Sequence, residues 1–408
     1  MEQAGVIVVG SGQGGFQVAA SLRDEGYARP VTLVGDEPGL PYQRPPLSKA
    51  FLAGKSQPGQ IELRPAAFYA ERNISVIAAD RVTAIDRTAR RVTLASGATL
   101  GYEHLVLATG ARARMPAVPG VELQGVLALR SRADAEAILG RLQQANRVVI
   151  VGGGFIGLEV AVMARQQGCE VRVIEFAERV LKRAVSAPTA DYLANALASR
   201  GVQFSLETGV TAFTGSGGHV EGVLTTRGET VAAELVVVGV GVEPNVELAR
   251  AAGLPVHNGI VVDPHLLTSD PLISAIGDCA SYPVTYCAVP VRLESVQNAV
   301  DQARCVAARI AGKAEPYAKV PWFWSDQGDN RLQIAGVAEA GDSAVQRGDS
   351  ARGKFSVLRF RDGHLTAVES INSVADHMAA RKLLAAATPI TPGQAADASV
   401  KLAALATP

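Results

Sequence analysis

Cysteine is scarce in this chain, and its spacing excludes several kinds of site. The 408 residues include four cysteines, Cys169, Cys279, Cys287 and Cys305. None forms a C-x-x-C pair, so the sequence indicates neither a zinc knuckle nor a local redox disulfide, and we expect no metal site. Reduced, buried thiols of a cytoplasmic protein are the expected state.

Net charge and long apolar runs are lacking as well. The 39 basic and 39 acidic residues balance to +0, so no overall field favours nucleic acid or an anionic membrane. No apolar run reaches the roughly 18–20 residues of a membrane span. A strand that begins by Val6 leaves no room for a signal peptide. We therefore expect a cytoplasmic protein, a monomer or weak dimer, whose length allows two or three domains.

The stretch from 148 to 175 has the pattern of a dinucleotide-binding unit. Its expected elements are the strand Val148–Val151, the G-x-G-x-x-G turn Gly152–Gly157, the helix Leu158–Gln167 and the strand Val171–Ile174. The first glycine permits a tight turn, the second lets phosphate approach the backbone, and the third lets helix pack on strand. Glu175 then follows the second strand, where a carboxylate binds ribose hydroxyls.

The start of the chain repeats this pattern. The expected elements are the strand Val6–Val9, the turn Gly10–Gly15, the helix Phe16–Glu25 and the strand Val31–Val34, followed by Gly35 and Asp36. Two dinucleotide sites in one protein most simply pass a hydride from one to the other. That indicates a flavin and a nicotinamide.

Several further segments are suited to the same purpose. The proline-rich segment Leu40–Lys49 predicts a rigid loop that enters a short helix near Leu47, although a surface turn with two solvated cations is an alternative. A hairpin is expected over residues 81–100. The next strand, Leu105–Leu107, ends in small residues that suit close backbone approach to a ring system, namely Ala108, Thr109 and Gly110.

Later parts of the chain predict the return to the first domain and a third domain. A buried strand over 235–238 has a glycine-rich exit through Gly241, and a chain crossing is expected at 243–245. The strand ending at Ile276 delivers Asp278 to a strand end, where ligands bind in such folds, although a helix-capping aspartate is an alternative. Ser295 is placed to cap a helix up to Ala311. The expected elements beyond 317 are the antiparallel strands Leu332–Val337, Ala344–Arg347, Phe355–Phe360 and Leu365–Ile371, followed by the helix Ala375–Ala387.

These motifs together resemble one family of flavoproteins. They are Gly10–Gly15, Arg44–Lys49 (RPPLSK), Ala108–Gly110, Gly152–Glu159, Gly277–Cys279, Glu294–Ala299 (ESVQNA) and Trp322–Gln327 (WFWSDQ). Over nearly its whole length the chain is similar to the FAD-dependent, NADH-using ferredoxin reductases of bacterial cytochrome P450 and ring-hydroxylating oxygenase systems. The RPPLSK and WFWSDQ stretches separate that family from other two-dinucleotide flavoproteins.

The resemblance implies an α/β fold and three domains. The fold has two Rossmann-like dinucleotide-binding domains, as in the glutathione-reductase-like FAD/NAD fold, and a C-terminal α+β domain. The expected FAD-binding domain is discontinuous, comprising residues 1–112 and 245–316. The NAD-binding domain comprises residues 113–244, and the C-terminal domain residues 317–408.

The resemblance and the motifs also assign residues to the two cofactors. The residues expected at FAD are Gly10, Gly12, Gly14, Gly15, Asp36, Arg44, Pro45, Lys49, Val82, Ala108, Thr109, Gly110, Arg130, Gly277, Asp278, Ser295, Val296 and Trp322. Those expected at NADH are Gly152, Gly154, Phe155, Ile156, Gly157, Glu159, Glu175, Arg183 and Gly241. In catalysis, Glu159 would face the nicotinamide and pair with Lys49, and Trp322 would lie close to the isoalloxazine, with core anchoring as its alternative role.

The activity implied is electron transfer from NADH through FAD to a [2Fe–2S] ferredoxin that serves a cytochrome P450 or Rieske oxygenase. One alternative is a flavin-dependent disulfide or peroxide reductase of the same fold. Such enzymes need a cysteine in the Leu40–Lys49 segment, or C-x-x-C in the second nucleotide domain, and the sequence has neither. The other alternative is a non-enzymatic flavoprotein, like apoptosis-inducing factor, which would need a basic face for DNA.

Overall fold

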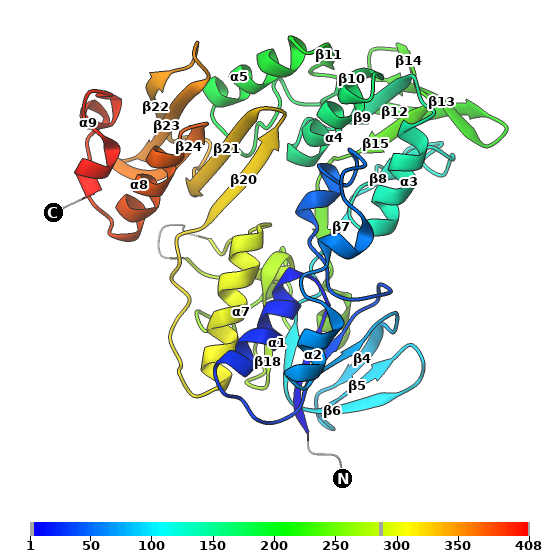
Figure 1. The fold of residues 1–408 in the computed structure, drawn as a ribbon, viewed down its shortest axis with the longest axis vertical. Coiled ribbons are helices and arrows are strands. Elements are labelled where there is room, and N and C mark those ends of the chain that lie inside the picture. Colours follow the sequence, from blue (N-terminus) through cyan, green and yellow to red (C-terminus); the bar gives the residue numbers. More distant parts are fainter. Residues whose placement is uncertain (1–3, 285–288, 407–408) are drawn as a thin grey trace. The chain divides into compact units, whose positions relative to one another are not determined.

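The computed structural model describes residues 4–284 and 289–406 (Figure 1), so Cys287 lies outside the described residues. The chain divides into two compact units. The first consists of described residues within 1–43, 58–112 and 243–319, and the second of those within 44–57, 113–242 and 320–408. Strands β7 (Ala111–Ala113) and β16 (Val242–Pro244) lie at two of the points where the chain passes between them.

The first unit is built on a mostly parallel sheet in the order β3-β2-β1-β6, with β18 beside β6. The two longest helices of this unit, α1 and α7, pack side by side (Figure 1). Its elements are β1 (Gly5–Val9), α1 (Gln13–Asp24), β2 (Val31–Val34), η2 (Pro58–Ile61), α2 (Ala66–Glu71), β3 (Ile74–Ile77), β4 (Val82–Asp86), β5 (Arg91–Leu94), β6 (Thr99–Leu107), α6 (Glu247–Ala251), β17 (Ile260–Val261), β18 (Ile273–Ala275), η3 (Gly277–Cys279), β19 (Ala280–Ser281) and α7 (Val296–Ile310).

Strand β6 joins the hairpin to the parallel sheet. At its start it pairs antiparallel with β5, and at its end it pairs parallel with β1. The sequence predicts two shorter strands here, one that closes the hairpin at residue 100 and one over Leu105–Leu107. In the structure both lie within one continuous strand, and the His104 side chain is buried.

The second unit contains another parallel sheet, in the order β11-β10-β9-β15-β8. A small antiparallel sheet, β12-β13-β14, follows β11 in the chain. The elements of this part are η1 (Pro45–Ser48), β8 (Val126–Ala128), α3 (Arg132–Leu142), β9 (Arg147–Val151), α4 (Phe155–Gln166), β10 (Glu170–Ile174), α5 (Ala187–Ala198), β11 (Val202–Ser205), β12 (Val210–Ser216), β13 (His219–Thr225), β14 (Thr230–Ala232) and β15 (Leu235–Val238).

The C-terminal part of the second unit is an antiparallel sheet in the order β20-β21-β24-β23-β22, against which α8 packs (Figure 1). Its elements are β20 (Trp322–Gln327), β21 (Asn330–Gly336), β22 (Ser343–Asp349), β23 (Lys354–Arg361), β24 (His364–Ile371), α8 (Val374–Ala385), α9 (Pro392–Ala396) and η4 (Leu402–Ala406). Asp362 and Gly363 turn β23 into β24 with positive φ angles of 50° and 79°, the backbone of a tight hairpin turn. The predicted mixed α/β fold, with two Rossmann-like sheets and an antiparallel C-terminal sheet, is confirmed.

The two helices that follow the glycine turns begin three residues earlier than the sequence predicts. Helices α1 and α4 begin at Gln13 and Phe155, inside the glycine turns, rather than at Phe16 and Leu158. Glycines disfavour helix by propensity, but these turns are short enough for their last residues to join the first helical turn. The predicted cap is confirmed, since the Ser295 hydroxyl accepts a 3.1 Å hydrogen bond from the Asn298 N–H at the start of α7.

Among the described residues, no helix has both the length and the apolar content needed to cross a membrane.

A buried histidine makes the stability of the first unit depend on pH. The His104 ring lies 2.9 Å from the Ser274 hydroxyl, which also accepts a 2.6 Å hydrogen bond from Arg309. Burial, reinforced by the nearby Arg309 charge, lowers the pKa of His104 to about 3. The imidazole is therefore neutral in the folded protein under all but strongly acidic conditions.

We predict that the free energy of unfolding falls as the pH drops from about 6.5 towards 3. In this window the unfolded chain protonates residue 104 and the folded chain does not, which costs up to about 1.4 kcal/mol per pH unit. His104→Gln should flatten this part of the profile, and above pH 7 its profile should run parallel to that of the wild type. Denaturant unfolding at a series of pH values measures both; an unchanged acid slope in the variant would contradict the assignment.

Candidate functional site

Three of the four glycines in the first turn are required for different physical reasons. Gly10 has φ +110°, and a Cβ there would lie 2.2 Å from the Ala108 carbonyl oxygen. A Cβ on Gly15 would lie 1.8 Å from the carbonyl oxygen of Gly10, so α1 could not approach the strand. A Cβ on Gly12 would meet nothing within 4 Å. The open space at Gly12 is where a phosphate can approach the helix N-terminus.

The second turn has the same geometry. Gly152 has φ +105°, and its Cβ would lie 2.5 Å from the Gly239 carbonyl oxygen. The Cβ of Gly157 would lie 2.3 Å from the oxygen of Gly152. At Gly154 the nearest atom is 3.7 Å away, which is ordinary contact. In both turns the middle glycine is therefore the position with space for a phosphate.

Each turn has a carboxylate after the second strand of its sheet. Glu175 follows β10, and its two oxygens accept hydrogen bonds from the Gly153 N–H at 2.6 Å and the Ala177 N–H at 2.8 Å. Asp36 follows β2 and is exposed. These are the strand ends at which a ribose binds in Rossmann-like sheets.

Three arginines lie on or after β10, and they differ in availability. Arg172 forms an ion pair with Glu229 at 2.7 Å, and Arg179 donates to backbone carbonyls of its own segment. Arg183 is exposed, and its guanidinium lies 3.6 Å from the position of a Cβ at Gly241. The structure thus brings Arg183 and Gly241 together, two residues expected on the nicotinamide side.

Five further residues expected at FAD in the first unit follow the ends of β6 and β18, namely Ala108, Thr109, Gly110, Gly277 and Asp278. Thr109 donates its hydroxyl to the Asn245 carbonyl at 2.7 Å, and the Asn245 amide donates back to the Thr109 carbonyl at 2.9 Å. Gly110 and Gly277 have positive φ angles of 65° and 72°. This reciprocal bond holds the small-residue end of β6 in a fixed geometry.

The backbone just after β18 is held by a buried side chain that the sequence reasoning missed. The Gly277 N–H donates a 2.7 Å hydrogen bond to the fully buried side chain of Gln302, in α7. A Cβ on Gly14 would lie 3.5 Å from the Ala299 methyl group, so α1 and α7 approach closely beside η3, which contains Asp278. Val82 packs in the core of this unit.

In the second unit a buried carboxylate collects donors from separate segments. Glu159, in α4, is 2% exposed. Its Oε2 lies 2.7 Å from Lys49 Nζ and also accepts a hydrogen bond from the Ser48 hydroxyl. Its Oε1 accepts a 2.6 Å hydrogen bond from Ser325. The expected Lys49–Glu159 ion pair is therefore present, and the buried charge is compensated at both oxygens.

The RPPLSK segment forms the short helix expected near Leu47. Pro45 occupies its first position, and the Pro45 carbonyl lies 3.4 Å from Lys49 Nζ. Arg44 precedes the helix and donates to the Arg130 carbonyl at 2.5 Å. Residues 44–57 belong to the second unit, so Arg44, Pro45, Lys49, Arg130 and Trp322 are grouped apart from the other residues expected at FAD.

The WFWSDQ strand presents different side chains on its two faces, because successive residues of a strand alternate. On one face, the Phe323 ring lies 4.6 Å from the Phe155 ring, and Ser325 bonds Glu159. On the other face, the ring centroids of Trp322 and Trp324 are 5.7 Å apart.

Trp322 packs within the C-terminal part of the second unit. Its ring lies 5.7 Å from that of His377 in α8, and the Arg381 guanidinium lies 4.8 Å from the ring centroid. It also packs against the apolar core formed by the sheet and α8. This packing agrees with core anchoring, the alternative role considered for this residue.

Ser48 and Ser325 are further site residues that the sequence reasoning did not identify. Both bond Glu159, and both lie inside the two motifs that separate the resembled family from its relatives, RPPLSK and WFWSDQ. The motifs drew attention to Lys49 and Trp322. Ser48 immediately precedes Lys49, and Ser325 lies three residues after Trp322. This closeness in the sequence was the signal that could have identified the two serines.

Metal and thiol chemistry have little support among the described residues. No group of histidine, cysteine, aspartate and glutamate side chains in residues 4–284 and 289–406 could hold a metal ion. Cys169 and Cys279 are buried and Cys305 is half-buried, and burial is the main cause that raises the pKa of each thiol. A raised pKa disfavours the nucleophilic thiolate at neutral pH.

Comparison with known proteins finds similarity along almost the whole chain. A family model described as "Pyridine nucleotide-disulphide oxidoreductase" matches residues 4–303, and one described as "Reductase C-terminal" matches residues 322–406. The chain is 48% identical over 397 residues to rhodocoxin reductase from Rhodococcus erythropolis, covering 97% of this chain and 93% of that protein.

Two solved structures are also similar. The ferredoxin reductase for the CYP199A2 system from Rhodopseudomonas palustris has a TM-score of 0.97 at 47% identity, covering 99% of this chain and 100% of that one. The covalent putidaredoxin reductase–putidaredoxin complex has a TM-score of 0.96 at 38% identity, covering 99% of this chain and 98% of that one.

Two alanine substitutions in the first turn should have different effects, one on stability and the other on flavin binding. Gly15→Ala should destabilise the protein by about 1–3 kcal/mol, because its methyl group meets backbone that cannot move aside. Gly12→Ala should cost less than about 1 kcal/mol in protein stripped of cofactor, yet lower the amount of bound FAD. Melting temperature and flavin absorbance separate the two effects; a Gly12→Ala protein with full flavin content would refute the phosphate position.

Proposed function

We propose, because the chain belongs to the pyridine nucleotide-disulphide oxidoreductase family, that it is an FAD-containing reductase that passes electrons from NADH to a [2Fe–2S] ferredoxin. The ferredoxin in turn serves a cytochrome P450 or a Rieske oxygenase. This places the protein among oxidoreductases of electron transport.

The observation that carries this proposal is the extent of the similarity. It reaches through the C-terminal sheet, beyond the two nucleotide sheets that many flavoproteins share. The relatives concerned are reductases of rhodocoxin and of the ferredoxin of the CYP199A2 system, and one was solved joined to putidaredoxin. A whole-chain match of this kind favours the same type of electron acceptor here.

We assign one role to each part of the chain. Residues 1–112 and 245–316 bind FAD, residues 113–244 bind NADH, and residues 317–408 form the C-terminal domain. The middle glycines support a pyrophosphate at each turn, because a Cβ on Gly12 would meet nothing within 4 Å and one on Gly154 nothing closer than 3.7 Å. The exposed Asp36 and the backbone-held Glu175 support a ribose beside each.

FAD, when bound, accepts a hydride from NADH and releases the electrons one at a time. The chain's own residues bind and orient the reactants, and no side chain has to act as a general acid or base. Lys49 would supply positive charge to the bound flavin, and Glu159 holds its ammonium group in place through the 2.7 Å ion pair. Ser48 and Ser325 in turn fix the Glu159 carboxylate.

The remaining site residues are proposed in the roles that the resemblance implies. At FAD these are Gly10, Gly14, Gly15, Arg44, Pro45, Val82, Ala108, Thr109, Gly110, Arg130, Gly277, Asp278, Ser295, Val296 and Trp322. At NADH they are Gly152, Phe155, Ile156, Gly157, Arg183 and Gly241. For Trp322 the packing against α8 means that a role near the flavin would be additional to anchoring this helix.

We also propose a cytoplasmic location. Three cysteines of the described chain are free thiols, which suits a reducing compartment where NADH is available.

Electron transfer should depend on a ferredoxin and on no cysteine. With NADH, the purified protein should reduce cytochrome c only when a [2Fe–2S] ferredoxin is added. A variant with Cys169, Cys279, Cys287 and Cys305 changed to alanine should retain this activity, because no thiol takes part. Loss of turnover in a variant that is folded and loaded with flavin would favour a disulfide or peroxide reductase instead.

NADH should be preferred over NADPH by about tenfold or more in kcat/KM, the scale of a lost charged hydrogen bond. Glu175 accepts from a 2′-hydroxyl and repels a 2′-phosphate. Arg172 and Arg179 are engaged elsewhere, which leaves Arg183 as the exposed one of these three arginines. Steady-state kinetics with both nucleotides measures the ratio, and similar values for the two would count against Glu175 as the selective group.

A further inference from the structure

A second buried carboxylate of the second unit, Glu369, bonds outside its own sheet. Glu369 lies in β24, is 1% exposed, and pairs with Arg359 of the neighbouring strand at 3.2 Å. The same carboxylate accepts hydrogen bonds from the Ser186 N–H at 2.9 and 3.0 Å and from the Ser186 hydroxyl at 2.6 Å. Ser186 immediately precedes α5, so a residue of the C-terminal sheet fixes the start of a helix in the nucleotide-binding part.

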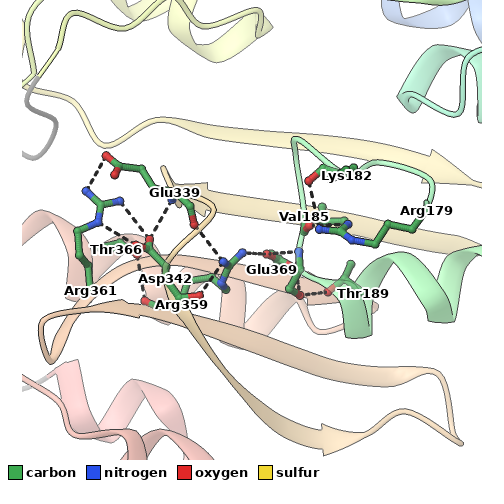
Figure 2. A network of polar contacts seen from close by, with 11 residues as sticks. Arg179, Lys182, Val185, Thr189, Glu339, Asp342, Arg359, Arg361, Thr366 and Glu369 are labelled. Carbon is green, nitrogen blue, oxygen red and sulfur yellow. Dashed lines mark hydrogen bonds and ion pairs between the residues drawn. The ribbon is translucent and has the colours of Figure 1, made fainter. Parts of the chain in front are cut away.

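Ser186 also ends the segment that follows Glu175. Within residues 176–186, Val180, Leu181 and Val185 are buried, and Arg179 donates to the carbonyls of Lys182 and Val185 (Figure 2). The segment therefore has a defined internal structure. Leu181 has φ +52°, a conformation that non-glycine residues rarely adopt and that the surroundings must hold.

The segment bonds directly to the glycine turn. The Leu181 N–H donates a 3.0 Å hydrogen bond to the Gly153 carbonyl, and Glu175 accepts from the Gly153 N–H at 2.6 Å. Both polar backbone groups of Gly153 are thus held by residues 175–186. The exposed Arg183 lies in the same segment, next to Gly241. Glu175 holds the start of this segment, and an anchor at Ser186 fixes its other end.

We propose that Glu369 is a positioning residue for nucleotide binding: it anchors residues 176–186 through Ser186, and this segment holds the Gly152–Gly157 turn and Arg183 in the geometry that binds NADH. The inference rests on the proposed function, because it takes that turn to be the NADH site. Glu369 touches no reacting atom in this scheme, so its loss weakens nucleotide binding and leaves the chemical step at saturating NADH unchanged.

The same sheet offers a matched control. Asp342 is also buried, at 7% exposed, and pairs with Arg361 through bonds of 2.8 and 3.1 Å. The Asp342 carboxylate also accepts hydrogen bonds from the Thr366 hydroxyl at 2.7 Å and the Glu339 N–H at 3.0 Å (Figure 2). Arg359, the partner of Glu369, donates a 2.9 Å hydrogen bond to the Asp342 backbone carbonyl, which Asp342→Asn keeps. These partners all lie in residues 339–366. Asp342→Asn therefore removes a comparable buried charge without touching the segment at Ser186.

The test compares Glu369→Gln with Asp342→Asn. We expect Glu369→Gln to raise the Kd for ADP-ribose, measured by calorimetry, and the KM for NADH by about tenfold, the scale of a charge-assisted hydrogen bond. Its kcat with ferricyanide should stay within about twofold of the wild type. Both variants should lower the melting temperature by similar amounts, because each removes a buried charge. Asp342→Asn should leave Kd and KM unchanged.

Ser186→Ala is the milder variant if Glu369→Gln does not fold. It keeps the Ser186 N–H and removes the hydroxyl with its bonds to Glu369 and Thr189, and it should raise Kd about threefold. Equal Kd values in the wild type and the folded Glu369 or Ser186 variant would overturn the inference. So would an equal rise in the Asp342 variant. If the wild-type protein itself bound no ADP-ribose or NADH, the proposed function would fail, which is a different result from a variant that binds as the wild type does.

Discussion

The buried carboxylate of Glu159 is the interaction on which the arrangement of the second unit depends. A carboxylate that is 2% exposed must be compensated, because an unpaired buried charge costs several kcal/mol. The donors come from η1 through Ser48 and Lys49, and from β20 through Ser325. These bonds require three parts of the second unit to meet at one point: helix α4, the short helix η1 and the C-terminal sheet. Their register follows from directional bonds, which an apolar contact would not specify.

The glycine turns apply a second constraint, which is steric. In both sheets a Cβ on the first or third glycine would clash with backbone, whereas a Cβ on the middle glycine would meet nothing closer than 3.7 Å. The enclosed positions bring helix and strand to the separation that directs the first amides of the helix at a phosphate. The same spacing thus serves packing and binding, and the two uses fall on different glycines of one motif.

Many strands and turns of the fold could be predicted from the sequence, because they depend on local patterns of residues. The strands beginning at Val6 and Val31 follow from short apolar runs, and the turns from glycine spacing. The continuity of β6 could not be predicted, since His104 is a polar residue whose burial is satisfied by Ser274, far away in the sequence. Long-range side-chain pairs such as Ser325 with Glu159 depend on strand register, which a single sequence does not reveal.

The two buried glutamates of the second unit also show how its nucleotide-binding and C-terminal parts are joined. Glu159 belongs to the nucleotide-binding part and accepts a bond from the C-terminal strand β20, while Glu369 belongs to the C-terminal sheet and accepts bonds from Ser186. The contact is therefore reciprocal, with one charge on each side. Net stability from such groups is small, because desolvation offsets much of the attraction. Their effect is on geometry: a shift that broke either set of bonds would leave a charge buried without compensation, so the two parts have one favoured register rather than a range of them.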